Sequence, residues 1–372
     1  MRVLIVGGGV IGLSIAWRLR QAGAQVHVLE RSIPGAEASS AAAGMLAAQK
    51  ESDGPGPFLN LCLESRGLYP AFAEELKETS GLDVRFRPCG VLSTALAETE
   101  LPHLTHTLRW QMKEGLHVET LSPNEARELE PALTPKLHGA LRFPQDAQVD
   151  NRLLIQALAQ CASRAGVAFH TGNVRGLVKR AERVTGIDLG GETLLGDAVI
   201  VAAGAWTGIV PGLGPASERV RPARGQMLCL QTRTPVTRHV LTSAQGYLVP
   251  REDGRVICGS TLEFRGFEKR VTAAGLAGLL EMATTLCPTL LDATVVDTWA
   301  GFRPYTEDRL PILGKGPFPG LFLASGHFRN GILLAPVTAR LTTDVVLGRT
   351  PHFDLSPFHW GRHSLAHSKA SP

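Results

Sequence analysis

Hydrophobic and polar positions follow two different periods over the first thirty residues. Residues 3–6 form an apolar run that stops at Gly7, residues 13–22 carry apolar side chains at three-residue spacing, and a second apolar run, 26–29, ends at Glu30. Short apolar runs are typical of buried strands, and three-residue recurrence gives a helix one apolar face. The pattern predicts a strand, a helix that ends near Gly23, and a second strand.

The same two periods predict elements along the rest of the chain. We expect helices over residues 59–78, 97–115, 152–164, 272–286 and 332–347. Ser122 and Asp150 are placed to cap helices, and Asp253 with Gly254 indicates a hairpin turn. Strands are expected over residues 83–88, 90–95, 117–121, 139–143, 167–171, 184–189, 192–195, 197–202, 221–232, 240–250, 255–261 and 321–324.

The order of these elements predicts an α/β domain interrupted twice by an α+β block. Alternating strands and helices occupy residues 1–82, 145–218 and 297–350, which we assign to one discontinuous domain. Residues 83–144 and 219–296 are rich in strands and should form a second domain on a mainly antiparallel sheet. Residues 351–372 are rich in Pro, Ser and His, and we expect a loose tail.

Composition is that of an ordinary globular protein and excludes several classes. With 372 residues, 44% of them hydrophobic, the chain can bury a sizeable core and form two domains. The net charge of +4 is mild and no run of five Lys or Arg occurs, so we expect no nucleic-acid partner.

Membrane segments and metal or disulfide frameworks are not expected either. The uncharged stretch 198–217 is broken by glycines and prolines, so it reads as a buried strand and a loop. Six cysteines stand singly without a CxxC pair, which favours a reducing cytoplasm. His359, His363 and His367 have a spacing that could bind metal on a helix, but Gly361 interrupts it, and we predict no metal site.

The glycines after the first apolar run carry the clearest chemistry. Gly7, Gly9 and Gly12, with Val10 and Ile11 between them, have GxGxxG spacing at a strand-to-helix turn. Glycine allows the tight turn, the close approach of a pyrophosphate and close helix packing, and the helix N-terminus attracts phosphate. Because Glu30 ends the next strand and can accept a ribose hydroxyl, the unit predicts a dinucleotide site.

Small side chains dominate residues 31–49, where another regular βα unit would be usual. They let a flat ligand lie against the backbone, and Ser39 and Ser40 can bind phosphate or ribityl oxygens. A helix N-terminus capped by serine explains the stretch equally simply, and the residues alone leave both interpretations open. Gly204 likewise lets backbone come near a ligand.

Six segments, taken in order, match one family: GGGVIGLSIAWRL, ASSAAAGML, PARGQM, GYLVPREDG, GFRPYTEDRLPILG and GHFRNGILLAP. The chain resembles the FAD-dependent D-amino-acid oxidase superfamily, and most closely its glycine oxidases. The resemblance spans residues 1–347, nearly the whole chain. It implies a Rossmann-like FAD-binding domain interleaved with a substrate domain.

The resemblance also implies roles for individual residues. FAD would extend from Gly7 to the C-terminal helix, with Val174 meeting adenine and Ala47 close to one face of the flavin ring. Tyr247, Arg303 and Arg329 match substrate-binding positions, and no obligatory general base is implied. The implied cofactor-binding residues are Gly7, Gly9, Val10, Ile11, Gly12, Glu30, Arg31, Ser39, Ser40, Ala43, Gly44, Met45, Val174, Gly204, His327, Arg329, Asn330, Gly331 and Ile332.

The implied reaction is the oxidative deamination of glycine, with sarcosine and small D-amino acids also accepted. Hydride transfer to flavin N5 would give an imine, then glyoxylate and ammonia, with dioxygen reduced to hydrogen peroxide. Related sarcosine oxidases hold flavin covalently through a cysteine near GFRPYTEDR. No cysteine follows Cys287 here, so we expect noncovalent FAD. Family precedent further implies a homo-tetramer and hand-over of product to a thiazole synthase in thiamine biosynthesis.

Residue chemistry supports the substrate roles less sharply. Arg303 can bind a substrate carboxylate in a bidentate fork stiffened by Pro304, although a surface arginine in a turn explains it as simply. Tyr247 can supply a hydroxyl, although such a tyrosine is more often core. The helix start at residues 326–331 can face the flavin edge where negative charge gathers on reduction. His327 is a candidate base, but a loop histidine held by hydrogen bonds is the commoner case.

Two other functions are compatible with the sequence. The chain could be a D-amino-acid dehydrogenase that passes electrons to a quinone, or a noncatalytic flavin-bound subunit of a larger assembly. Retention of Tyr247, Arg303 and Arg329 together argues for a substrate site of its own.

Overall fold

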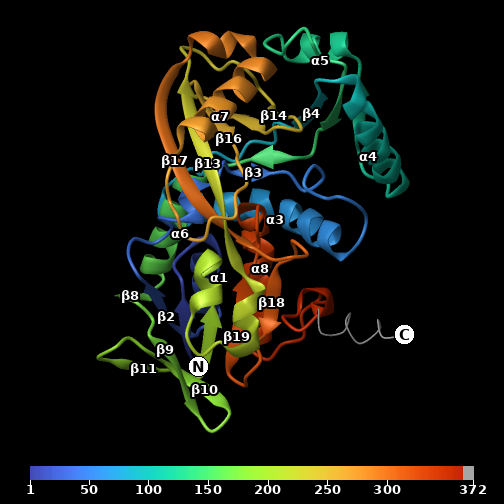
Figure 1. The fold of residues 1–372 in the computed structure, drawn as a ribbon. Coiled ribbons are helices and arrows are strands. Elements are labelled where there is room, and N and C mark those ends of the chain that lie inside the picture. Colours follow the sequence, from blue (N-terminus) through green and yellow to red (C-terminus); the bar gives the residue numbers. More distant parts are fainter. Residues whose placement is uncertain (363–372) are drawn as a thin grey trace, which may run out of the picture.

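The computed structural model describes residues 1–362 and shows an elongated molecule built on two large sheets (Figure 1). The first strand of the chain belongs to a six-stranded sheet of order β18-β19-β12-β1-β2-β8, in which every pair is parallel except β18 with β19. Its strands are β1 (Arg2–Val6), β2 (Gln25–Glu30), β8 (Ala168–Thr171), β12 (Ala198–Val201), β18 (Ile312–Lys315) and β19 (Leu321–Ser325).

Four long helices pack with this sheet into one hydrophobic core. They are α1 (Val10–Gln21), α3 (Pro57–Ser80), α6 (Asn151–Arg164) and α8 (Gly331–Val346). Trp17 of α1 and Tyr69 of α3 are fully buried there, and the Tyr69 hydroxyl donates to the Ile332 carbonyl of α8 at 2.5 Å. Parallel sheets need cover on their faces because their strands are apolar throughout, which is why β1 and β12 are buried along almost their whole length.

The second large sheet has eight strands in the order β17-β13-β16-β15-β14-β4-β6-β5 and is antiparallel except between β14 and β4. Helix α7 (Ala273–Leu286) packs on this sheet through Leu279, Met282 and Leu286. The strands are β4 (Val91–Ala95), β5 (Glu119–Leu121), β6 (Gly139–Phe143), β13 (Arg221–Gln231), β14 (Val240–Thr242), β15 (Tyr247–Pro250), β16 (Arg255–Gly259) and β17 (Thr294–Tyr305).

Two long strands connect the halves of the molecule. Figure 1 shows β13 and β17 running from the half that holds α7 down to the middle of the molecule. They pair antiparallel from Arg221 with Tyr305 to Gln231 with Thr294, with one bulge after Cys229. Both strands contact η2 (Gly204–Ile209), the segment that follows β12 of the six-stranded sheet, and β13 also packs against α7.

The remaining elements are short. A three-stranded sheet, β9 to β11, lies at the lower end of Figure 1, and β3 pairs with β7 between the large sheets. The bounds are β3 (Met45–Leu46), β7 (Ala147–Gln148), β9 (Gly176–Arg180), β10 (Arg183–Asp188), β11 (Thr193–Leu195), α2 (Ala38–Ala41), α4 (Leu101–Lys113), α5 (Pro123–Leu129), η1 (Glu98–Glu100), η2 (Gly204–Ile209), η3 (Gly214–Arg219), η4 (Pro288–Asp292) and η5 (Ser356–Phe358).

Most predicted elements are confirmed, and two are wrong. Asp150 caps α6 by accepting from two backbone N–H groups, and Ser122 and Glu125 form a capping box on α5. Residues 83–88 are not a strand, because only Arg87 makes a bridge, to Gln148. Residues 240–250 are two strands rather than one, because the chain turns between Ser243 and Gly246 and β14 pairs with β15.

The predicted domain boundaries remain a prediction, and β17 runs without a break across the one at residues 296 and 297. The expected loose tail is wrong for residues 351–362. Phe358 is fully buried, and Arg362 donates from Nε to Asp308 Oδ2 at 2.6 Å. His363 and His367 lie outside the described residues.

Residues 1–362 contain no group of three potential metal-binding side chains, and none of their helices has the length and apolarity needed to cross a membrane. All six cysteines are free thiols, and five of them are buried.

Candidate functional site

A cavity of about 330 Å³ lies between the two large sheets. One end is bounded by the turn after β1 and the start of α1, and the other by β13, β15 and β17. Its lining comes from segments that are far apart in the sequence: residues 6–11, 29–45, 172–174, 202–211, 225–227, 301–304 and 324–332, together with Tyr247. A cavity of this shape suits a long ligand with chemically different ends.

The glycine turn follows directly from the β1 and α1 packing. Gly7 has φ of 106°, and a Cβ there would lie 2.5 Å from the Ala202 carbonyl oxygen of the neighbouring strand end. Gly12, predicted both as a cofactor-binding residue and as the glycine that lets the helix pack closely, does not line the cavity. A Cβ on Gly12 would lie 1.9 Å from the Gly7 carbonyl oxygen, so its part is to let α1 approach the turn.

Glu30 and Ser39 are held against this turn. Glu30 Oε2 accepts from the Gly8 N–H at 2.9 Å, and Ser39 Oγ accepts from the Val10 N–H at 3.0 Å. Both residues line the cavity. Ser40 does not, because its hydroxyl donates to the Gly35 carbonyl at 2.6 Å and faces its own loop.

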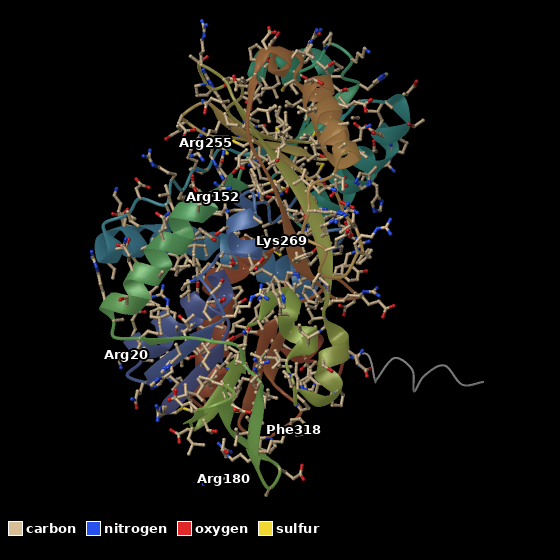
Figure 2. All side chains as sticks on the ribbon, turned by 60° about the vertical axis from the view of Figure 1, so that its left-hand side comes forward. Arg20, Arg152, Arg180, Arg255, Lys269 and Phe318 are labelled. Atoms are coloured by element: carbon tan, nitrogen blue, oxygen red, sulfur yellow. The ribbon has the colours of Figure 1, made fainter. Side chains whose placement is uncertain are left out.

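Val174, Gly204 and Arg31 also line the cavity. The Arg31 guanidinium lies 3.8 Å from the centre of the Trp206 ring and pairs with Glu37 at 2.5 Å. Glu37 also binds Lys269 at 2.7 Å, which ties the loop after β16 to this wall. Figure 2 shows Lys269 midway along the long axis of the molecule.

Arg303 lies at the other end, on β17, in space that Gly225 of β13 leaves open. A Cβ on Gly225 would come within 2.3 Å of the guanidinium. Arg303 donates from Nη1 to the Thr261 carbonyl at 3.1 Å and from Nη2 to Ser260 Oγ at 2.5 Å. Burial lowers the pKa of Arg303, and nearby Tyr247 acts against this. Among the described residues, Arg303 has no carboxylate partner.

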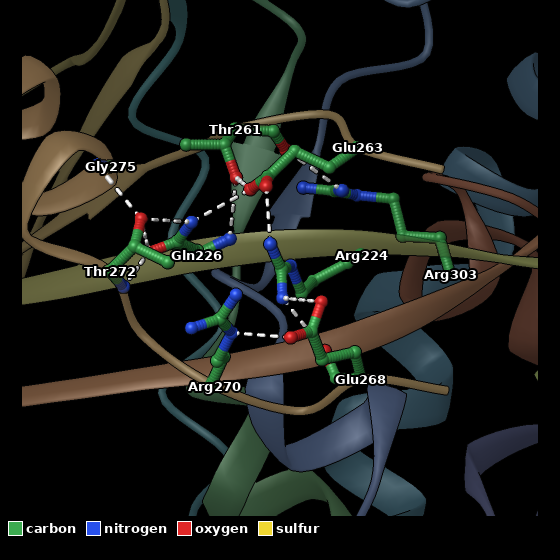
Figure 3. A network of polar contacts seen from close by, with 9 residues as sticks. All are labelled: Arg224, Gln226, Thr261, Glu263, Glu268, Arg270, Thr272, Gly275 and Arg303. Carbon is green, nitrogen blue, oxygen red and sulfur yellow. Dashed lines mark hydrogen bonds and ion pairs between the residues drawn. The ribbon is translucent and has the colours of Figure 1, made fainter. Parts of the chain in front are cut away.

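A polar network fixes the loop that holds Arg303 (Figure 3). Glu263 accepts from Thr261 Oγ1 at 2.6 Å, from Gln226 Nε2 at 2.7 Å and from the buried Arg224 at 2.5 Å. Burial raises the pKa of the Glu263 carboxyl, but these hydrogen bonds, with that from Arg224 the strongest, outweigh burial and lower the pKa to about 2. The loop is thus strapped to β13, and the Thr261 carbonyl stays aimed at Arg303.

Tyr247 and Arg329 lie close to Arg303 but are bound differently. The Tyr247 hydroxyl lies beside Arg303 and makes a weak contact, 3.6 Å, to Met227 Sδ, and the residue is 7% exposed. Arg329 pairs with Glu51 at 2.9 Å, which raises the pKa of Arg329. Of the two arginines, Arg303 is therefore the one whose charge is not balanced by a neighbouring carboxylate.

His327 is buried at the start of α8, and its Nε2 lies 3.0 Å from Thr338 Oγ1. Burial lowers its pKa to about 3. His327 is therefore a loop histidine held by a hydrogen bond, and it is not poised to act as a base. Asn330 is the N-cap of α8 and does not line the cavity, since its backbone bonds to His327 and Leu334 turn it into the helix start.

The structure brings most of the predicted site residues to one cavity. The exceptions, which do not line the cavity, are Gly12, Ser40, Asn330 and Ala47. Ala47 is buried in a hydrophobic core. Sequence reasoning missed Trp206, Gly225, Met227 and Gly301, although each lies in or beside a motif already recognised. A glycine inside a strand is a signal for close approach, and it would have found Gly225 and Gly301.

Comparison with known proteins identifies the family. The family model described as FAD dependent oxidoreductase matches residues 2–345. The chain belongs to this family. This FAD-dependent oxidoreductase is 38% identical to a glycine oxidase of Geobacillus kaustophilus over 97% of each chain. It superposes on the crystal structure of glycine oxidase from that organism with a TM-score of 0.93, covering 97% of this chain and 99% of the other.

A second kind of relative is longer. The oxidoreductase is 41% identical to a bifunctional ThiO/ThiG protein of a Synechocystis strain, over 93% of this chain and 51% of the relative. The chain therefore corresponds to about half of that protein.

Proposed function

We propose that this FAD-dependent oxidoreductase oxidises glycine, and also accepts sarcosine and small D-amino acids. One observation carries the proposal: a buried arginine without a carboxylate partner, Arg303, shares a cavity with the GxGxxG turn. A dinucleotide anchored at the turn has its reactive end near Arg303, and an amino acid offers Arg303 a carboxylate.

The cavity fits FAD, since side chains are missing where the cofactor must approach the backbone. Gly7, Gly9, Gly44 and Gly301 all line the cavity and present backbone without a side chain. FAD supplies a two-electron acceptor at its flavin ring. Glu30 would hold the ribose, Val174 the adenine, and residues 43–45 with 327–332 the flavin end.

Arg303 binds and orients the substrate in this proposal. Its guanidinium presents a planar fork to the carboxylate, and the Thr261 carbonyl and Ser260 hydroxyl restrain it. Tyr247 lines the same end of the cavity and can offer its hydroxyl to the same anion. Arg329 lies at the rim, where Glu51 holds it.

No general base is needed if glycine binds with a neutral amine. His327 is poorly suited to the task, because burial lowers its pKa to about 3 and Thr338 occupies Nε2. The amine lone pair can assist as the Cα hydride leaves, which gives an imine. Water hydrolyses the imine to glyoxylate and ammonia, and dioxygen accepts the two electrons to become hydrogen peroxide.

We further infer a place in thiamine thiazole biosynthesis, with hand-over of the imine to a thiazole synthase. The support is the relative named bifunctional ThiO/ThiG. A homo-tetramer is proposed from the family resemblance, and sizing chromatography with light scattering tests it.

The deciding experiment is spectroscopic. The purified protein should be yellow, release its FAD on denaturation as expected for a noncovalent cofactor, and lose its flavin absorbance anaerobically with glycine. Air should restore the absorbance with release of hydrogen peroxide. A protein that retains FAD but is bleached by none of glycine, sarcosine, D-alanine and D-proline contradicts the proposal.

A further inference from the structure

The loop of residues 39–44 turns its backbone carbonyls away from the cavity that it lines. Asn151 Nδ2 donates to the Ser39 carbonyl at 2.8 Å and to the Ser40 carbonyl at 3.1 Å. Trp299 Nε1 donates to the Ala41 carbonyl at 3.0 Å. Two elements other than the loop, α6 and β17, thus hold it from behind.

Arg251, the residue after β15, binds the Ala43 carbonyl of this loop. Its Nη2 donates to that oxygen at 2.8 Å and its Nη1 to Gln148 Oε1 at 2.6 Å. The residue is 7% exposed, and within residues 1–362 it forms no ion pair. Burial lowers its pKa, and the Asp150 carboxylate partly offsets this. A buried guanidinium with neutral acceptors is costly, which indicates that its position matters for more than surface charge.

The planarity of the peptide bond fixes the direction of the N–H groups in this loop. The C=O and N–H of a trans peptide point in opposite directions. Because Trp299 holds the Ala41 carbonyl and Arg251 holds the Ala43 carbonyl from behind, the N–H groups of Ala42 and Gly44 point to the cavity side. Within the described residues, neither N–H has a hydrogen-bond partner. Both residues line the cavity.

Close packing around this peptide requires glycine at position 44. Its φ is +78°, and a Cβ would lie 2.0 Å from the Val149 carbonyl oxygen and 3.2 Å from Arg251 Nη2. The loop, β7 and Arg251 are therefore packed without room for a side chain.

We propose that Arg251 is a positioning residue for the flavin. It fixes the Ala43–Gly44 peptide so that the Gly44 N–H donates to an acceptor atom of the flavin ring, and its positive charge strengthens that donor from behind. Trp299 does the same, without charge, for the Ala42 N–H. The proposal rests on the proposed FAD site and adds residues that touch neither FAD nor substrate. It predicts that the flavin becomes harder to stabilise as an anion when Arg251 is lost.

The test compares Arg251→Met with Arg255→Met. Arg255 is a matched control, because it lies four residues on, pairs with Asp253 at 2.8 Å and does not line the cavity; Figure 2 shows it near Arg152. Two constants are measured by absorbance: the Kd for FAD and the Kd for sulfite, which adds to the flavin and leaves it anionic.

Arg251→Met should raise both constants tenfold or more, whereas Arg255→Met should change each less than twofold. Arg251→Lys keeps the charge and one donor, and should recover part of the sulfite affinity. If Arg251→Met does not fold, Trp299→Phe, which removes only the indole N–H, should still weaken FAD binding measurably.

Arg251→Met with both constants within twofold of the unaltered protein overturns the proposal. So does a fall in thermal stability in which sulfite and FAD affinities are unchanged, since this is the result of a purely structural role. None of these measurements depends on catalytic turnover of an amino acid. A protein that binds FAD but fails to oxidise glycine would contradict the proposed function and leave this test intact.

Discussion

At the scale of single residues, Arg303 differs from its neighbours in the partners it binds. It is held by a carbonyl and a hydroxyl, whereas Arg224 and Arg329 are paired with carboxylates. We predict that Arg303→Ala raises the KM for glycine at least tenfold while the bound FAD per chain stays the same. Steady-state kinetics and the flavin spectrum measure this, with the exposed Arg349→Ala as control. Lost FAD with an unchanged KM would contradict the assignment.

Glu51 sets how much positive charge the substrate meets. It neutralises Arg329, so the pocket offers one unbalanced cation, which matches a substrate with one carboxylate. We expect Glu51→Gln to raise the ratio of kcat/KM for iminodiacetate to kcat/KM for glycine about tenfold, because Arg329 is then available to a second carboxylate. Glu78→Gln, at an exposed position on α3, is the control. An unchanged or lower ratio for Glu51→Gln would contradict this role of Glu51.

Buried His327 predicts a pH dependence of stability. Burial lowers its folded pKa to about 3 from 6.5, so protonation favours the unfolded chain. The stability it contributes is complete above pH 6.5 and is lost as pH falls toward 3, at about 1.4 kcal/mol per pH unit for one proton. Denaturant unfolding at pH 7, 6 and 5, with the same FAD concentration throughout, measures this dependence. The free energy of unfolding should fall less steeply with falling pH in His327→Asn than in the unaltered protein. Equal slopes would rule out His327 as the titrating group.

At the scale of elements, the pairing of β13 with β17 decides the substrate end of the site. Gly225 lies opposite Gly301 in this register, and Arg303 two residues further along β17 reaches back over Gly225. An alanine at 225 cannot coexist with the guanidinium in its present place, so Gly225→Ala should raise the KM for glycine at least tenfold.

Gly278→Ala is the matched control for this substitution. Gly278 lies in α7, and a Cβ there meets nothing within 4 Å. Replacing a helical glycine should stabilise the protein by about 0.5–1 kcal/mol and leave the KM unchanged. If both substitutions act alike on the KM, close packing at Gly225 is not the cause.

Two strands were predicted wrongly because a local pattern does not specify the pairing partner of a strand. Residues 83–88 have strand composition, yet the segment only crosses between α3 and β4 and finds a single bridge partner at Gln148. Residues 240–250 read as one strand because the Ser243–Gly246 turn has no strong turn dipeptide. In both cases the deciding fact is which neighbour is available to pair, and pairing partners are not encoded locally.

At the scale of the whole molecule, the cavity is a joint product of both sheets. Adding FAD to FAD-free protein should therefore protect backbone amides on both sides at once: in residues 7–12 and 325–331 near the six-stranded sheet, and in residues 41–47, 225–227 and 301–304 toward the eight-stranded sheet. Hydrogen exchange measured by mass spectrometry tests this. Protection confined to residues 7–30 would mean that the ligand engages only the glycine turn.

The sequence by itself determined what depends on near neighbours in the chain. The GxGxxG turn, the helix caps at Ser122 and Asp150 and the buried strands follow from local steric and hydrogen-bonding rules, and the ordered motifs led to the family. The tertiary structure alone decided which side chains face the cavity. Ser40 and Asn330 turn away because local backbone groups hold them, while Arg251, 208 residues from Ala43 in the chain, reaches its carbonyl. Orientation toward a shared cavity depends on contacts between distant segments, and no local pattern specifies them.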